Sequence, residues 1–419
     1  MFKFVASLSL AVVVLASPAQ GQKMTLNVSY SSGAYTAMLE ETARSFEAKH
    51  PNIKIAYRAP VMATYDELIQ QTLRAQITSD LPDVSFQGNQ HIKLLAQRGL
   101  PVQLDPLIAR EASWDKLGYS PSVKAVGEVD GKVYALSYAT SVPIIYFNVD
   151  LVRRAGGDSQ SLPRTWPDIT ALVRKIHGLG GGVIGGFFDY QSTGNWTFQA
   201  LITSQGGRMV TPDDTKITFD GGEGMEALRV LQALGAAGTV DMTQAQALQA
   251  FGAGTIGVLA SFSAAIEQLE KQAAGKFEMR TEQWPMPSAE GKVPAGGRAA
   301  MIFARDPERQ RAAWDFVKFV TGPIGQTILV KGVGAVPNNQ IAIREPDLLG
   351  KFYEAHPNQK AAFALVPALT SWYSFPGENS VKIANVLRDH LRSVYIQQRD
   401  PAAAMPQMVR DVKALLPRS

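Results

Sequence analysis

The chain has 419 residues, of which 46% are hydrophobic and 19% are charged, and its formal net charge is +4. These values describe a chain that buries a sizeable core in about two domains, and they exclude a disordered or collagen-like protein. The sequence contains no cysteine, which excludes disulfides, thiolate nucleophiles and iron–sulfur clusters and leaves histidines and carboxylates as metal ligands. The small net charge, without a run of basic residues, gives no support for nucleic-acid binding.

The first 21 residues are typical of a secretory signal peptide. Lys3 provides the positive charge, residues 4–16 are almost uninterruptedly apolar, and small residues at 17–21 offer a cleavage site. The apolar stretch is shorter than the roughly 20 residues that a membrane-spanning helix needs, and no cysteine follows it for lipid attachment. We therefore expect residues 1–21 to be removed on export, leaving an unanchored protein in the periplasm.

Strand and helix patterns alternate in the first part of the mature chain. Period-two runs predict strands at 24–30, 53–57 and 82–86, and apolar residues at helical spacing predict helices at 37–50 and 65–78. This alternation indicates a parallel, doubly wound α/β sheet. Ligands of such sheets bind beyond the carboxyl ends of the strands, so we expect the loops at 30–33 and 86–91 to face a binding site.

The pattern continues to the end of the chain. Further strands are expected at 130–136 and 142–148, and helices at 150–155, 165–179, 195–205, 224–236, 260–274, 306–321, 323–331, 380–398 and 401–416. No internal repeat and no low-complexity linker occurs. The domains are therefore not expected to be joined by a flexible tether.

Several short motifs occur in a fixed order along the chain. They are Asp130-Gly131-Lys132-Val133-Tyr134-Ala135-Leu136, Ile145-Tyr146-Phe147-Asn148 with Asp150-Leu151, Ala155-Gly156, Pro163-x-Thr165-Trp166, Trp314-x-Phe316-Val317-Lys318-Phe319-Val320-Thr321, Gly332-x-Gly334-x-Val336-Pro337 and a closing helix from Pro401. The ordered set resembles the family 1 extracellular solute-binding proteins of bacterial ABC importers, which carry sugars, sugar derivatives and glycerol phosphate esters.

The resemblance implies an α/β fold of the periplasmic-binding-protein type II, with two doubly wound lobes, a hinge and an interlobe cleft. The chain is expected to cross between the lobes near 140–143, near 297–301 and beyond 350. The expected lobes are residues 22–140 plus 300–350 and residues 141–299 plus 351–419. The arginine that glycerol-3-phosphate binders carry in a late loop has no counterpart here, where Pro376 and Gly377 stand.

Candidate ligand residues in the first lobe follow the expected strands. Tyr30 and Ser31 come after the first strand, and Gln87 and Asn89 after the third, where amides can pair with sugar hydroxyls. Tyr65 matches in position a tyrosine that lines the cleft of glycerol-phosphate binders, although a packing role at the start of its helix is equally compatible. Two more candidates, Thr140 and Ser141, occupy the first crossing, where a hydroxyl can also be satisfied by its own turn.

Candidates in the second lobe combine aromatic faces with polar groups, as saccharide recognition requires. Asp189 can accept hydroxyls or cap a helix, and Tyr190 and Trp196 can form platforms or core. The strand-to-helix turn at Ser261 and Ser263 offers backbone donors. The remaining aromatic candidates are Trp372 and Tyr373, which precede the expected third hinge.

The pair Gly297-Arg298 departs from a neutral-sugar binder. The family uses the Gly296-Gly297 loop for backbone contacts with the ligand. An arginine beside it can form a bidentate pair with a carboxylate, sulfonate or phosphate of the ligand, or it can form a salt bridge between the lobes.

Catalytic and metal motifs are missing from the sequence. The five histidines are far apart, and neither a His-Glu-x-x-His nor a Gly-x-Ser-x-Gly motif occurs. The sequence therefore predicts no catalytic residues, no metal and no cofactor. It predicts a monomeric periplasmic protein that binds a carbohydrate or polar glycoside and delivers it to an ABC permease. Two alternatives stay open: an anionic ligand such as a glycerophosphodiester or sugar acid, and a secreted carbohydrate hydrolase that uses Asp189 with a second carboxylate.

Overall fold

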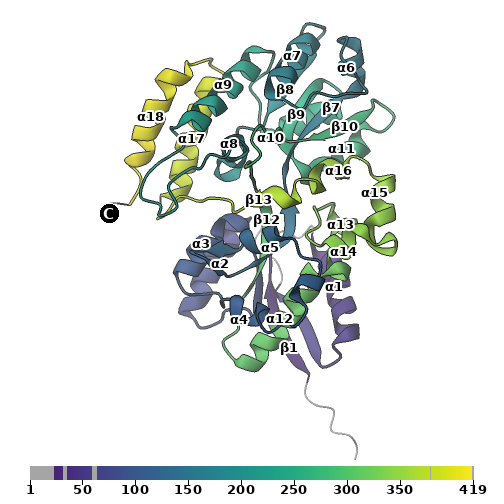
Figure 1. Ribbon diagram of the computed structural model, residues 1–419, viewed down its shortest axis with the longest axis vertical. Helices are drawn as coiled ribbons and strands as arrows, with labels where there is room; N and C mark the ends of the chain where they lie inside the picture. Colours follow the sequence, from purple (N-terminus) through teal and green to yellow (C-terminus); the bar gives the residue numbers. More distant parts are fainter. Residues whose placement is uncertain (1–22, 32–34, 59–63, 378, 418–419) are drawn as a thin grey trace, which may run out of the picture.

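The computed structural model describes residues 23–31, 35–58, 64–377 and 379–417. The expected signal peptide lies outside these residues. The chain forms two α/β lobes, one above the other in Figure 1, each built around its own sheet. None of the helices in the described part of the chain has the length and apolar character required to cross a membrane.

The N-terminal lobe contains a five-stranded sheet with the order β2-β1-β3-β12-β6. Its strands are β1 (Met24–Ser29), β2 (Ile53–Arg58), β3 (Val84–Gly88), β6 (Leu136–Ser141) and β12 (Gly296–Ile302). Strand β1 is parallel to β2 and β3, whereas β12 is antiparallel to both of its neighbours. The sheet is thus doubly wound as expected, with one antiparallel strand that arrives from the distant end of the sequence.

The C-terminal lobe contains a four-stranded sheet with the order β10-β7-β9-β8. Its strands are β7 (Pro143–Asn148), β8 (Ile184–Phe188), β9 (Ile256–Phe262) and β10 (Met279–Gln283). Strands β8 and β9 are parallel, and β7 is antiparallel to β9 and β10. The expected helix at 260–274 is wrong in its first residues, because β9 continues to Phe262 and the helix begins only at Ile266.

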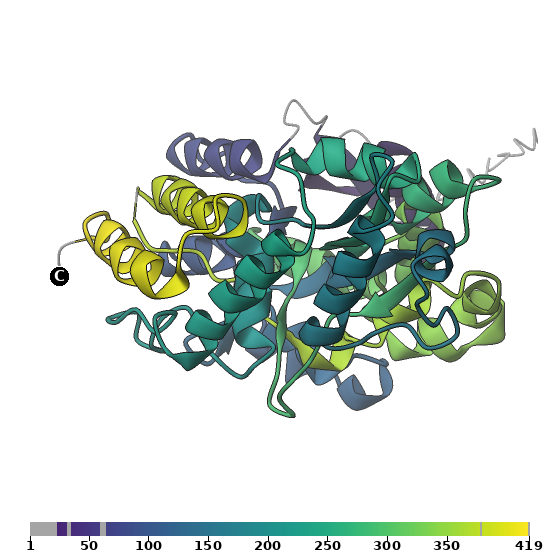
Figure 2. The same ribbon diagram turned by 90° about the horizontal axis from the view of Figure 1, so that it is seen from above.

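Helices cover the sheets of both lobes. In the N-terminal lobe they are α1 (Thr36–Lys49), α2 (Tyr65–Ile77), α3 (Ile92–Gln97), α4 (Asp105–Ile108), α5 (Pro121–Ala125), α12 (Pro307–Thr321), α13 (Pro323–Val333) and α14 (Gln340–Arg344). In the C-terminal lobe they are α6 (Val149–Arg154), α7 (Trp166–His177), α8 (Trp196–Thr203), α9 (Gly222–Ala236), α10 (Gln244–Gly252), α11 (Ile266–Ala273), α16 (Gln359–Phe363), α17 (Ser380–Tyr395) and α18 (Pro401–Lys413). Helix α15 (Lys351–Ala355) connects α14 to α16, and α17 and α18 lie side by side at one end of the molecule (Figures 1 and 2).

The helix starts are readable in the sequence. Thr64 and Glu67 form a reciprocal capping box at α2, and Asp306 accepts hydrogen bonds from two backbone N–H groups at the start of α12. Thr243 and Gln246 form the same box at α10, a helix that the sequence analysis did not predict. Side-chain oxygens at these positions satisfy N–H groups that have no partner within the helix.

The lobes are connected where strands pass from one sheet to the other. Only Val142 separates β6 from β7. The second connection runs through β11 (Val293–Pro294), which pairs with β13 (Leu369–Thr370). Because Gly296 already pairs with Ser141 in the N-terminal sheet, this connection lies before 296 and not at the expected 297–301.

The hydrophobic core is shared between the lobes. One cluster, with Phe46, Phe86 and Phe316, fills the N-terminal lobe on one side of its sheet. The larger cluster fills the C-terminal lobe and also includes Leu95 and Met301 of the N-terminal lobe. The lobes are therefore packed against each other in this structure.

Candidate functional site

The two main sheets direct their polar edges toward each other. Strands β1, β3 and β6 end, and β12 begins, at the edge of the N-terminal sheet where β6 passes through Val142 into β7. Strand β7 begins there, and β8 and β9 end at the same edge of the C-terminal sheet. Residues that follow these strands therefore gather at the junction between the lobes, which is where ligands of open α/β sheets bind.

Arg298 lies at this junction on the N-terminal side. Its side chain is 5% exposed, and its guanidinium lies 3.9 Å from the ring centre of Tyr35 and 4.9 Å from that of Tyr65. Its Nη2 donates to the carbonyl of Ser31 at 3.3 Å, while Nε has no partner. Among the described residues no carboxylate forms an ion pair with it, so the interlobe salt bridge that the sequence left open is not present there.

Asp189 lies at the junction on the C-terminal side, directly after β8, and is 1% exposed. Its Oδ2 accepts hydrogen bonds from the Nε2 of Gln244 and, at 3.3 Å, from the Oγ of Ser261. Its Oδ1 has no partner. Burial disfavours the charged form and raises the pKa of Asp189 to about 6. At neutral pH this group is a buried carboxylate with one free acceptor oxygen.

An amide and three aromatic side chains lie beside the connections between the lobes. Asn89 donates from Nδ2 to the carbonyls of Ala295 and Gly296, at 2.9 and 3.2 Å, and its Oδ1 has no partner. The rings of Trp196 and Trp372 are 6.2 Å apart. The indole N–H of Trp196 donates to the carbonyl of Pro294, but the indole N–H of Trp372 and the hydroxyl of Tyr373 have no partner.

Buried polar atoms without a partner are the distinguishing feature of this junction. Native proteins pair the large majority of such atoms, because each unpaired one costs about 1–3 kcal/mol. Here they come from both lobes: Ser31, Gln90, His91 and Arg298 from one, Asp189 from the other, and Asn89, Trp372 and Tyr373 beside the connections. These atoms include both hydrogen-bond donors and acceptors, so a polar solute enclosed between the lobes would supply their missing partners.

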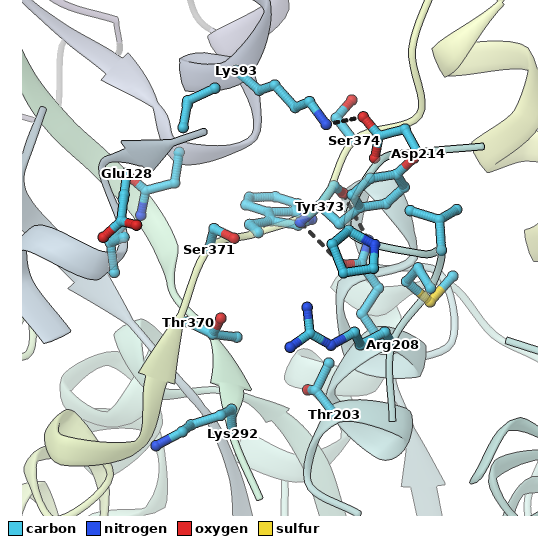
Figure 3. A pocket seen from close by; sticks show the side chains of 18 of the residues that line it. Lys93, Glu128, Thr203, Arg208, Asp214, Lys292, Thr370, Ser371, Tyr373 and Ser374 are labelled. Atoms are coloured by element: carbon cyan, nitrogen blue, oxygen red, sulfur yellow. Dashed lines mark hydrogen bonds and ion pairs between the residues drawn. The ribbon is translucent and has the colours of Figure 1, made fainter. Parts of the chain in front are cut away.

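A cavity of about 520 Å³ opens at the same junction. Asn89, Trp372 and Tyr373 line it together with side chains of both lobes, among them Arg208 and Lys292 (Figure 3). Its volume is in the range of small-molecule sites in proteins. The loops at 206–214 form much of its wall; the sequence analysis did not single them out, although the Gly206-Gly207 pair marks a turn there.

An ion pair closes one side of this cavity. Lys93 at α3 of the N-terminal lobe contacts the carboxylate of Asp214 in a loop of the C-terminal lobe, and its ammonium lies 5.9 Å from the ring centre of Tyr373 (Figure 3). Both side chains are partly buried. The pair joins the lobes directly.

Several predicted site residues are held by their own lobe. The hydroxyl of Tyr30 pairs with Thr36 at 3.0 Å, and the Nε2 of Gln87 donates to Thr72 and Ser85 at 2.8 Å, although its Oε1 is unpaired. Tyr190 packs against Tyr395 in the core of the C-terminal lobe and donates to Asp241. We therefore place Tyr30 and Tyr190 outside the candidate site, as packing residues. Gln87 keeps one buried unpaired oxygen near the end of β3.

The residues of the crossing also have structural partners. Thr140 donates to Asn338 at 2.9 Å, and the Oγ of Ser263 accepts from the backbone of Val142 at 3.0 Å. The Oγ of Ser141 lies 3.4 Å from that of Ser263. These hydroxyls fix the β6 to β7 connection rather than offering free groups to a solute.

Gly297 has a backbone role. Its φ is +99°, and a β-carbon there would lie 1.9 Å from the carbonyl oxygen of Ala139 on β6. The glycine thus lets β12 approach β6 closely, just before a register shift between Arg298 and Ala299.

Comparison with known proteins identifies the family. The model of the family described as bacterial extracellular solute-binding protein matches residues 41–361, and the chain belongs to this family. The sn-glycerol-3-phosphate-binding periplasmic protein UgpB of Rhizobium meliloti (strain 1021) is 22% identical over 398 residues, which are 90% of each chain.

Solved structures share the fold. The cyclic α-maltosyl-1,6-maltose binding protein from Arthrobacter globiformis superimposes with a TM-score of 0.79 at 19% identity, over 94% of this chain and 99% of that chain. UgpB from Mycobacterium tuberculosis, in complex with glycerophosphocholine, gives a TM-score of 0.76 at 19% identity, over 94% and 98%. The expected type II fold of periplasmic binding proteins is thereby confirmed, and the protein is a solute-binding protein of the extracellular family.

Proposed function

We propose that the protein is the solute-binding component of an ABC importer and that it encloses a carbohydrate or polar glycoside between its lobes. The observation that carries this proposal is the set of unpaired buried polar atoms contributed by both lobes at their junction. Sugar hydroxyls both donate and accept, and Trp372 and Tyr373, which line the cavity, have aromatic faces that suit the C–H surfaces of a sugar ring. The names of the relatives, which bind a glycerol phosphate or an oligosaccharide, support the same class of solute.

The proposed mechanism is a shift in population between open and closed lobe arrangements. A solute that contacts Asp189 of one lobe and Asn89 of the other binds the closed form better than the open form and stabilises it. The permease then recognises the closed form. In this proposal the protein is a monomer without a cofactor, and residues 1–21 direct it to the periplasm.

The proposed lobes remain residues 22–140 plus 300–350 and residues 141–299 plus 351–419. The pairing of Gly296 with Ser141 supports an earlier start, at about 296, for the returning segment of the first lobe.

A panel of neutral sugars and glycosides tests the proposed function. We expect saturable binding in calorimetry and a smaller radius of gyration in solution scattering when a sugar binds, because closure buries the junction. If no small solute in the panel produces either change, the proposal is wrong. Incubation of the bound sugar with protein, followed by analysis of products, tests the hydrolase alternative. No contact favours this alternative, because no second carboxylate is bonded to the Asp189 side chain among the described residues.

The ion pair between Lys93 and Asp214 is expected to favour closure. Replacement Asp214→Ala removes it, so the unliganded protein should show a larger radius of gyration and bind its solute about threefold to tenfold more weakly. The matched control is Asp213→Ala, because the Asp213 carboxylate bonds only within its own loop, to Thr211 and Thr215. Equal radii for the two variants would show that the pair does not hold the lobes together.

A further inference from the structure

The side chain of Arg298 is a buried cation for which the described protein supplies no anion. It is 5% exposed and forms no ion pair among the described residues. A buried charge is retained in proteins when it is paired. Outside the described residues the sequence has one acidic side chain, Glu378. Among the described residues, the groups in contact with the guanidinium are two tyrosine rings and a backbone carbonyl.

The tyrosine rings leave only the edge of the guanidinium for a partner. Tyr35 and Tyr65 lie 3.9 and 4.9 Å from its central carbon, measured to the ring centres. Interaction with the ring faces offsets part of the cost of burial, but it satisfies no N–H group. The Nε–H, which has no partner, is one of the in-plane donors with which arginine binds carboxylate, phosphate and sulfate oxygens.

The surroundings add a second donor. The Oγ of Ser31 is fully buried and has no partner, and the carbonyl of the same residue accepts from Arg298. Tyr35 is the N-cap residue of α1 and Tyr65 is the first residue of α2. Two helices therefore begin beside the guanidinium. The first turn of α1 contains no acidic residue and its N-cap side chain makes no capping hydrogen bond, so this helix end favours an anion. The first turn of α2 already contains Asp66 and the capping Glu67.

We propose that the solute carries an anionic group, a carboxylate or a phosphate or sulfate ester, which binds the edge of Arg298 and the hydroxyl of Ser31. This inference rests on the proposed function and narrows it to hydroxylated acids and esters. It also orients the solute: the anionic end lies on the N-terminal lobe, and the hydroxyl-bearing end lies toward Asp189, whose carboxylate repels an anion. The anion site belongs to one lobe, so it is able to capture the solute before closure.

Matched pairs of probes that differ only in charge test the inference. Glucose 6-phosphate and glucuronate are compared with glucose, and sn-glycerol 3-phosphate with glycerol, by calorimetry on the mature protein and on Arg298→Met. We expect at least one anionic member to bind at least tenfold more tightly than its neutral partner. Arg298→Met should remove at least tenfold of the affinity for the anionic member and weaken the neutral partner less, so that the preference for the anion is lost. The phosphate and carboxylate arms show which anion the site takes.

Two controls keep the outcomes distinct. Arg208→Met removes the arginine that lines the cavity and should leave the preference for the anion in place. Far-ultraviolet dichroism and a cooperative thermal unfolding transition show that Arg298→Met is folded. Equal binding of charged and neutral members, unchanged in Arg298→Met, overturns the anion site alone. Binding of no probe from any pair overturns the proposed function together with this inference.

Discussion

Replacement Asp189→Asn is expected to weaken solute binding roughly 100-fold at pH 7.5. Gln244 donates to one oxygen of this carboxylate, so the amide oxygen of Asn will take that position and its NH2 will face the junction. The free acceptor becomes a donor, and the charge that strengthens hydrogen bonds from hydroxyls is lost. Calorimetric titration with the solute measures the effect. Unchanged affinity would show that Asp189 does not contact the solute.

The same replacement is expected to stabilise the unliganded protein, and this gain in stability should grow as pH rises. The folded-state pKa of Asp189 is raised from 3.8 to about 6, so the folded protein binds more protons than the unfolded chain between these values. Its free energy of unfolding therefore falls as pH rises through this window. Asn does not titrate, so the variant should gain up to about 3 kcal/mol over the wild type at pH 8 and nothing at pH 4.

Thermal unfolding of both proteins at several pH values measures this difference. Asp213→Asn is the control, because Asp213 is exposed and hydrogen bonds from Thr211 and Thr215 lower its pKa to about 2. Its replacement should change stability in the opposite direction and leave solute binding intact. A difference between wild type and Asp189→Asn that does not vary with pH would mean that the buried carboxylate is not the cause.

Solute affinity of the wild type should also fall below pH 6, where Asp189 is protonated.

Replacement Gly297→Ala is expected to lower the free energy of unfolding by more than about 3 kcal/mol. The residue has a φ of +99°, and the added β-carbon would lie 1.9 Å from the carbonyl oxygen of Ala139. Backbone strain of this kind costs about 1–3 kcal/mol, and the contact with backbone forces β6 and β12 apart. Arg298 follows directly, so anion binding should weaken as well. The midpoint of urea unfolding measures the loss of stability.

Gly131→Ala separates strain from steric overlap. Gly131 also has a positive φ, +73°, but an added β-carbon has no neighbour within 4 Å. It should cost only the intrinsic penalty of a left-handed residue, about 1–2 kcal/mol. Equal losses in the two variants would contradict the close approach of β12 to β6.

Local sequence patterns predicted most helices and strands of the fold. They failed where a short run of residues is compatible with both a strand and a helix. Ser261 and Ser263 were predicted to lie at a strand-to-helix turn, but the helix was predicted to begin too early, at 260. A short apolar run does not by itself show where a strand gives way to a helix, and pairing with β7 extends the strand to Phe262. Helix α10 lacks a strong apolar stripe, yet the capping box of Thr243 and Gln246 marks its start and offered a signal that was not used.

The candidate site was predicted less completely than the fold. Arg298, Asp189, Asn89 and Trp372 were singled out from position and chemistry, and the structure brings unpaired atoms of all four to the junction. Tyr190 carries the same chemistry one residue after Asp189, but its ring packs into the core against Tyr395. Position along the chain cannot distinguish these cases, because the direction of a side chain depends on what packs around its backbone.

The sequence by itself determined the class of this protein: its two-lobed α/β fold, its family, and the strand ends at which ligand groups are found. Local periodicity indicates the α/β class and the strand ends, and the resemblance of the ordered motifs to a family implies the two lobes and the family. None of these needs a contact between distant segments. The tertiary structure alone decided which polar atoms stay unpaired. Arg298 is 267 residues from Ser31, whose carbonyl it contacts, and only the antiparallel insertion of β12 beside β3 brings them together. The burial of Arg298 and its lack of an ion-pair partner among the described residues result from that packing, and they make Arg298 the predicted contact for an anion.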